Sequence, residues 1–111
     1  MRWDYSEVDT PTVYVDVDGT LLLWRERYGK GVPLINEPLV NSLRHQHEGG
    51  TMIYLWSRGG AKHAEMAADF CGIKRIVAGY MHKPQMMVDD DFRWLDAAFR
   101  VDPAKKTVLV A

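Results

Sequence analysis

The chain alternates between short apolar runs and longer stretches in which apolar residues recur with helical spacing. Runs of the first kind, bounded by glycine, proline or polar residues, occupy positions 13–15, 51–56, 75–78, 85–88 and 106–110. Short β-rich runs that alternate with helical patterns are typical of a parallel sheet with crossover helices. The pattern therefore predicts an α/β domain with about five strands.

The stretches between the runs predict three helices. Asn36-Glu37-Pro38 supplies the start of the first, which runs to about His47 before Gly49-Gly50 ends it. The second spans about 61–71, and the third precedes the last strand. The residues expected to face inward are Leu39, Val40 and Leu43 in the first helix, Ala64, Ala67, Ala68 and Cys71 in the second, and Phe92, Leu95 and Phe99 in the third.

Composition adds a size and a compartment to this picture. The 111 residues, 47% hydrophobic and 26% charged, suit one soluble domain around a single core. No stretch approaches the roughly 20 apolar residues of a membrane span, and the acidic start has no signal-peptide pattern. Cys71 is the only cysteine, which excludes an intramolecular disulfide. We expect a cytoplasmic protein with no membrane partner.

The net charge argues against one class of partner, the nucleic acids. The formal charge is -1, whereas a protein whose main function is to bind a nucleic-acid backbone is usually strongly basic. A local basic patch passes this test, so a nucleic-acid end stays among the candidate substrates.

Polar side chains gather where the predicted strands end. They are Asp16 and Asp18 after the first strand, Ser57 after the second, Lys83 before the fourth, and Asp89, Asp90 and Asp91 after it. The carboxyl ends of parallel strands lie along one edge of a sheet, so these residues are expected to converge. Acids hold a hard divalent cation, while a hydroxyl and an ammonium bind phosphate oxygens. The set predicts a phosphoryl site.

This order of residues resembles the haloacid dehalogenase (HAD) superfamily of phosphohydrolases over nearly the whole chain. The four motifs are matched by Asp16-Val17-Asp18-Gly19-Thr20-Leu21, Leu55-Trp56-Ser57, Lys83 and Met86-Met87-Val88-Asp89-Asp90. The resemblance implies a three-layer Rossmann-like fold with strand order 3-2-1-4-5. It also implies Mg²⁺ and the hydrolysis of a phosphate monoester through an aspartyl phosphate.

The resemblance gives the two leading carboxylates different roles. Asp16 would attack phosphorus, because a carboxylate beside a cation can act as a nucleophile. Asp18 would protonate the leaving oxygen and then take a proton from the attacking water. In the superfamily an aspartate two positions after the nucleophile is a feature of phosphatases and mutases, which favours ester hydrolysis here. Ser57 would bind a phosphoryl oxygen, and Lys83 would neutralise its charge.

The metal ligands implied are a side-chain oxygen of Asp16, the main-chain carbonyl of Asp18 and the carboxylate of Asp89. Asp90 either binds the metal through water or positions Lys83, and Asp91 has no expected role beyond capping the next helix. The residues expected to contact substrate or phosphate are Gly19, Thr20, Ser57, Arg58 and Lys83.

The chain has no room for the cap domain of larger superfamily members. We interpret residues 1–111 as one core domain with a short flap at about 21–35. An uncapped site often goes with macromolecular substrates, or with oligomers whose neighbours supply a lid, so a homo-oligomer is one alternative. Aromatic and basic residues of the flap either contact a phosphorylated polymer or form a solvated loop; they are Trp24, Arg25, Arg27, Tyr28 and Lys30.

Two other function classes fit the same residues. A phosphoacceptor or regulatory module also combines an aspartate cluster with a lysine around a cation, although the Asp-x-Asp-Gly-Thr pattern counts against it. A catalytically silent protein that binds phosphate ligands is the other alternative. Among the histidines, His82 lies near enough to the expected site to contact substrate, whereas His45 and His47 suit a helix end at the surface.

Overall fold

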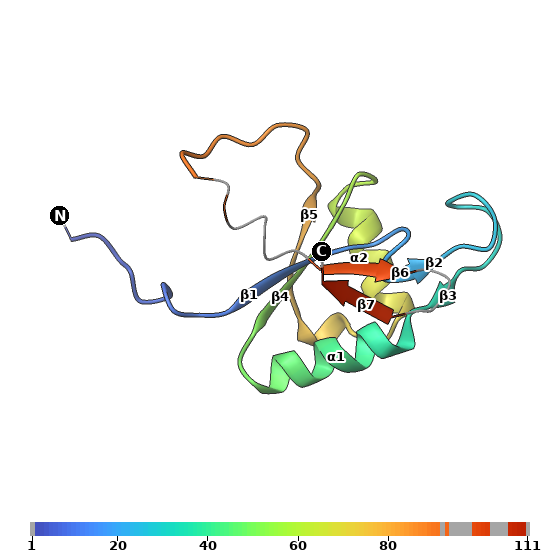
Figure 1. Ribbon diagram of the computed structural model, residues 1–111, viewed down its shortest axis with the longest axis horizontal. Helices are drawn as coiled ribbons and strands as arrows, with labels where there is room; N and C mark the ends of the chain where they lie inside the picture. The colour runs from blue at the N-terminus through green and yellow to red at the C-terminus, as the bar shows by residue number, and fades with distance from the viewer. Residues whose placement is uncertain (1, 92, 94–98, 103–106, 111) are drawn as a thin grey trace.

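A computed structural model describes the chain except for residues 1, 92, 94–98, 103–106 and 111. Its main sheet has three parallel strands in the order β1-β4-β5 (Figure 1). The strands are β1 (Thr12–Asp16), β4 (Met52–Ser57) and β5 (Val77–His82). The α/β class is therefore confirmed. The first three predicted strands lie side by side as expected.

Both helices predicted between these strands are confirmed, as α1 (Glu37–Glu48) and α2 (Ala61–Phe70). The start of α1 is fixed by Asn36, whose Oδ1 accepts a hydrogen bond from Leu39 N at 3.2 Å. A short 3-10 helix, η1 (Lys74–Ile76), leads from α2 into β5. Neither α-helix has the length and apolar character needed to cross a membrane, among the residues described.

The core lies between the sheet and these helices. Val15, Ile53 and Leu55 alternate with more exposed residues along β1 and β4, as a sheet with one buried face requires. They share one buried cluster with the inward-facing residues predicted for the two helices: Leu39, Val40, Leu43, Ala64, Ala67, Ala68 and Cys71. Burial raises the pKa of the Cys71 thiol to about 11.

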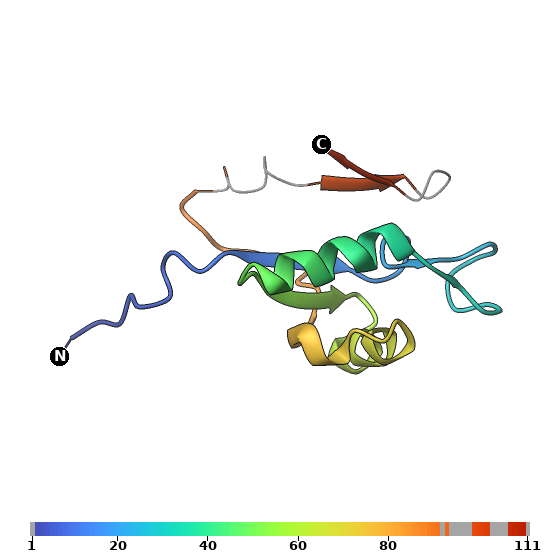
Figure 2. The same ribbon diagram turned by 90° about the horizontal axis from the view of Figure 1, so that it is seen from below.

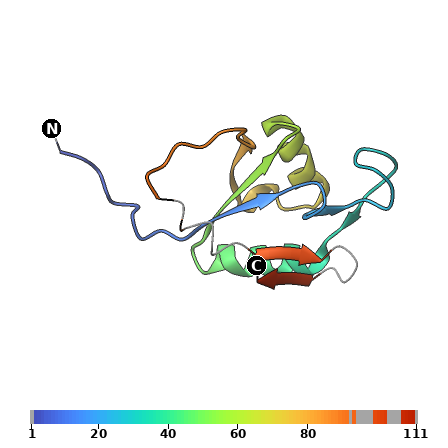
Figure 3. The same ribbon diagram turned by 45° about the horizontal axis from the view of Figure 1, so that its top comes forward.

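The flap forms a small hairpin beyond the carboxyl end of β1 (Figure 3). Its base is an antiparallel pair, β2 (Leu22–Leu23) and β3 (Leu34–Ile35). The buried side chain of Asn36 donates to the carbonyl of Thr20 at 3.1 Å. The base of the flap is therefore tied to the turn that leaves β1.

The third predicted strand is longer and later than expected. We predicted residues 75–78, whereas β5 continues to His82 and pairs with β4 as far as Ser57. Gly79 packs closely against β4, since a Cβ there would lie 3.1 Å from Tyr54 Cδ1. As a result Lys83 follows directly on a strand end.

The predicted fourth strand, 85–88, is wrong: residues 83–91 form no strand. Pro84 removes one ladder donor, and two local contacts favour turns instead. Asp91 N donates to Asp89 Oδ1, and Arg93 N donates to Asp91 Oδ1, each at 3.0 Å. The segment leads away from the carboxyl end of β1 in Figures 1 and 3, and Val88 is 98% exposed.

The last described strands form a separate antiparallel pair, β6 (Phe99–Asp102) and β7 (Thr107–Val110), which lies alongside α1 (Figure 2). The strand predicted at 106–110 is thus present, but within the described residues it pairs with β6 rather than with the main sheet. Phe99 begins a strand instead of ending a helix, and Phe92 and Leu95 lie outside the described residues. The five-strand order 3-2-1-4-5 is not confirmed.

Candidate functional site

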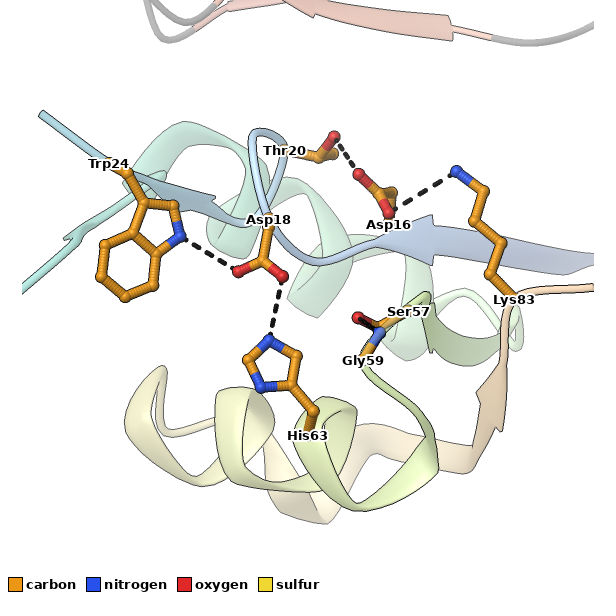
Figure 4. Close-up of polar contacts among 8 residues, drawn as sticks. All are labelled: Asp16, Asp18, Thr20, Trp24, Ser57, Gly59, His63 and Lys83. Carbon is orange, nitrogen blue, oxygen red and sulfur yellow. Dashed lines mark hydrogen bonds and ion pairs between the residues drawn. The ribbon is translucent and has the colours of Figure 1, made fainter. Parts of the chain in front are cut away.

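The carboxyl ends of β1, β4 and β5 bring three of the predicted site residues together (Figure 4). Asp16 pairs in register with Trp56, and Ser57 pairs with His82, so the three strands end at neighbouring positions. Lys83 N then donates to the carbonyl of Ser57 at 2.8 Å. The parallel ladder places an acid, a hydroxyl and an ammonium along one edge.

Asp16 is held at this edge by two side chains. Lys83 Nζ lies 3.6 Å from Oδ1, and Thr20 Oγ1 donates to Oδ2 at 3.2 Å. The Asp16 side chain remains 33% exposed, so a substrate can reach it. The turn depends on Gly19, whose φ of +86° disfavours other residues. A Cβ at Gly19 would also collide with the Tyr28 hydroxyl of the flap.

The Asp18 carboxylate points away from Asp16 and contacts two other elements (Figure 4). Trp24 Nε1, from the flap, donates to Oδ1 at 3.0 Å, and His63 Nε2, from α2, lies 2.9 Å from Oδ2. Both carboxylate oxygens are therefore engaged. The contacts fix the carboxylate in one orientation between the flap and the helix.

The sequence pattern predicts no role for His63, whereas it places His82 near the expected site and His45 and His47 at a helix end. A signal for it existed, because His63 lies in the first turn of α2, directly after the strand-end turn that carries Ser57. Helix starts that follow parallel strands lie at the same edge as the strand ends. Gly59 makes room for the imidazole, since a Cβ there would lie 3.0 Å from His63 Cδ2.

Ser57 is 2% exposed and stabilises its own turn. Its Oγ accepts a hydrogen bond from Gly59 N at 3.0 Å, and its carbonyl accepts one from Gly60 N at 3.0 Å. The hydroxyl hydrogen is left to donate to another acceptor. Ser57 can thus support the turn and offer a donor to an anion at the same time.

Lys83 is half-buried between a carboxylate and an aromatic ring. Besides its contact with Asp16, its Nζ lies 5.8 Å from the centroid of the Trp56 ring, within the range of a cation–π interaction. The ring and the carboxylate together keep the ammonium at the strand edge.

Asp89 and Asp90 of the predicted fourth motif, and the additional acid Asp91, do not join this group. Asp89 and Asp90 are exposed, and the described residues contain no group of three acidic, histidine or cysteine side chains arranged to hold a metal ion. The Asp91 carboxylate lies 2.6 Å from Arg93 Nη2, and hydrogen bonds from Arg93 lower the pKa of Asp91. Asp91 also accepts from Arg93 N, as a capping residue does.

Comparisons of the chain with protein-family models, with curated proteins and with solved structures found no significant match. The resemblance to HAD phosphohydrolases therefore rests on the residues of this chain alone.

Proposed function

We propose that this chain is a Mg²⁺-dependent phosphatase of the HAD type, which hydrolyses a phosphate monoester through an aspartyl phosphate on Asp16. The observation that carries the proposal is the convergence of Asp16, Ser57 and Lys83 at one edge of the sheet. A partly exposed carboxylate beside an ammonium and a hydroxyl donor suits nucleophilic attack on phosphorus.

In the first step, Asp16 forms a bond to phosphorus as the bond to the leaving oxygen breaks. Lys83, 3.6 Å from Asp16 Oδ1, lies where it can offset the negative charge of the phosphoryl oxygens. The Ser57 hydroxyl donates to one of these oxygens. In the second step, water attacks phosphorus, phosphate leaves and the Asp16 carboxylate is regenerated.

Asp18 carries the proton in both steps. It gives a proton to the leaving oxygen and later takes one from the attacking water. In the structure Trp24 and His63 hold its carboxylate turned away from Asp16, so Asp18 has to turn toward the leaving oxygen for these steps. We assign these two side chains as the residues that set its orientation. Trp24 links the flap to Asp18 through its hydrogen bond.

The donor set fits Mg²⁺ in part. Mg²⁺ is often held by one or two carboxylates, with waters and substrate phosphates completing the octahedron. Asp16 and the main-chain carbonyl of Asp18 supply hard oxygen donors on one turn, and a bound ion would neutralise charge on the phosphoryl group. Asp89 and Asp90 stay candidate ligands on the sequence alone, since the described residues do not gather them with Asp16.

The same proposal includes the order of strands in the sheet, the cellular compartment and the partner. A Rossmann-like sheet in the order 3-2-1-4-5 would place a further strand beside the edge of β1 at which no described strand pairs. We also propose a cytoplasmic protein whose partner is a phosphorylated substrate.

The test is phosphate release from a panel of small and polymeric phosphate esters, with Mg²⁺ and with excess chelator. We expect Mg²⁺-dependent release by the wild-type protein and at least a thousandfold loss in Asp16→Asn. No release from any ester would contradict the proposal. Tight phosphate binding without turnover would favour the silent binding protein, and a long-lived phosphoaspartate would favour the phosphoacceptor module.

A further inference from the structure

A positively charged cleft opens beside the candidate site. It has a volume of about 390 Å³ and is lined by Arg58, His82, Lys83, Pro84 and Gln85. This volume falls within the range of about 300–1,000 Å³ that is usual for small-ligand sites. Lys83 belongs both to this cleft and to the contact with Asp16, so a molecule in the cleft lies next to the proposed nucleophile.

We propose that this cleft binds a second phosphate group of the substrate. The preferred substrate is then a phosphate ester with another phosphate or phosphodiester group, and not a simple monoester. This inference rests on the proposed function, because it takes Asp16 as the position of the reacting phosphate.

The fold fixes the two walls of the cleft against each other. The carbonyl of Ser57 accepts hydrogen bonds from Gly60 N at 3.0 Å and from Lys83 N at 2.8 Å. One oxygen thus joins the turn that carries Arg58 to the end of β5. His82 lies close to the same turn, since a Cβ at Gly60 would be 3.8 Å from His82 Cδ2.

The charges of the lining residues favour an anion. Arg58 and Lys83 are cationic, and none of the described residues that line the cleft is acidic. Within the described part of the chain, no carboxylate forms an ion pair with Arg58, so its guanidinium is free to bind a ligand. A guanidinium offers paired donors that match the oxygens of a phosphate.

His82 adds a defined donor or acceptor. Its Nδ1 lies 2.8 Å from the carbonyl of Lys83, and because a carbonyl only accepts, Nδ1 carries the hydrogen. Nε2 is then left to meet a ligand. The first turn of α2 begins at the neighbouring Gly60 with no side-chain cap, and its positive end adds to the attraction for an anion.

A second cavity provides the contrast. It measures about 240 Å³ and is lined by residues that include His47, Thr51 and Arg75, at the amino-terminal ends of β4 and β5. Arg75 therefore lies at the opposite edge of the sheet from Asp16. Arg75→Ala is a matched control for Arg58→Ala, because each removes one arginine that lines a cavity.

The experiment compares kcat/KM for matched pairs of esters with one or two phosphate groups. The probes are fructose 6-phosphate with fructose 1,6-bisphosphate, and thymidine 5′-monophosphate with thymidine 3′,5′-bisphosphate and 5′-phosphorylated dithymidylate. We expect the wild-type protein to have a higher kcat/KM for the probes that carry a second phosphate or phosphodiester group. Arg58→Ala should reduce that preference about tenfold. Gln85→Glu, which adds a negative charge to the cleft, should reduce it as well, whereas Arg75→Ala should not.

An equal preference in the wild-type protein, Arg58→Ala and Gln85→Glu would overturn the inference, as would no preference in the wild-type protein. The probe whose kcat/KM falls most in Arg58→Ala identifies the source of the second phosphate, either a small bisphosphate or a nucleic-acid end. Equilibrium binding of the same probes to Asp16→Asn separates this inference from the proposed function. Arg58-dependent binding of bisphosphates by a protein that hydrolyses no ester would support the cleft and contradict the phosphatase. Hydrolysis that does not depend on Arg58 would support the phosphatase and contradict the second phosphate site in the cleft.

Discussion

The strand ends of the main sheet and the acidic segment that follows β5 were both predicted to build one site, yet only the strand ends come together. Asp16, Ser57 and Lys83 meet because β1, β4 and β5 pair in a fixed parallel register. Asp89 and Asp90 lie in residues 83–91, which pair with no strand and leave Val88 98% exposed. Residues that are distant in sequence come together when their strands pair in a sheet. An apolar segment that pairs with no strand does not bring its flanking residues to the site.

The largest expected difference between the two regions is in amide hydrogen exchange. Ile53 and Leu55 lie in the central strand with fully buried side chains, whereas Met86 and Val88 are exposed. We expect exchange at Ile53 and Leu55 to be at least about a thousandfold slower, because their amides open only with the core. The measurement is exchange followed by NMR or mass spectrometry. Protection at Met86 and Val88 similar to that in β4 would mean that the predicted fourth strand forms after all.

Lys83→Met should have the next largest effect, about a hundredfold loss in kcat/KM for phosphate-ester hydrolysis. The variant removes the ammonium that lies 3.6 Å from Asp16 but retains most of the packing against Trp56. Steady-state kinetics measure the loss. Lys74→Met is the matched control, since Lys74 is exposed and its ammonium lies 3.8 Å from the surface residue Glu65. Similar values of kcat/KM for Lys83→Met and Lys74→Met would show that Lys83 takes no part in catalysis.

His63→Ala should lower kcat about 20-fold and leave KM nearly unchanged, because the orientation of Asp18 matters in the chemical steps. His63→Gln should restore much of kcat, since its amide group can replace the contact of Nε2 with Asp18. Steady-state kinetics with a thermal unfolding control measure both effects. A purely structural role would instead lower the stability of both variants and show no rescue by glutamine.

Asp89→Asn tests the acidic segment directly and has the smallest expected effect at saturating metal. If Asp89 is a ligand, the variant should need about tenfold more Mg²⁺ for half-maximal activity, and excess Mg²⁺ should recover most of the rate. The measurement is a Mg²⁺ titration of phosphate release. Asp91→Asn is the control, because Asp91 pairs with Arg93 at the surface. Identical titrations for Asp89→Asn and the wild-type protein would show that Asp89 does not bind the metal.

The residues most accurately predicted from the sequence are those whose surroundings are local. The start of α1 at Asn36 and the buried alanines of α2 follow from capping and spacing within a few positions. These features need no knowledge of distant partners.

The features that the sequence did not predict depend on such partners. The strand predicted at 75–78 continues to His82 because it pairs with β4, a partner that the local sequence does not reveal. The contact between His63 and Asp18 joins positions 45 residues apart. The apolar run at 85–88 resembled a buried strand, but no strand that the structure describes pairs with it. In each case the deciding contact is absent from the local pattern.

The central claim is that the chemistry occurs at the end of β1, with Asp16 as the nucleophile. The most direct measurement is rapid acid quenching during turnover of a phosphate ester, followed by peptide mass spectrometry. We predict one phosphoryl group on the peptide that contains Asp16 in the wild-type protein, and none in Asp16→Asn. Phosphorylation of another residue, or turnover without any phosphorylated peptide, would contradict the account.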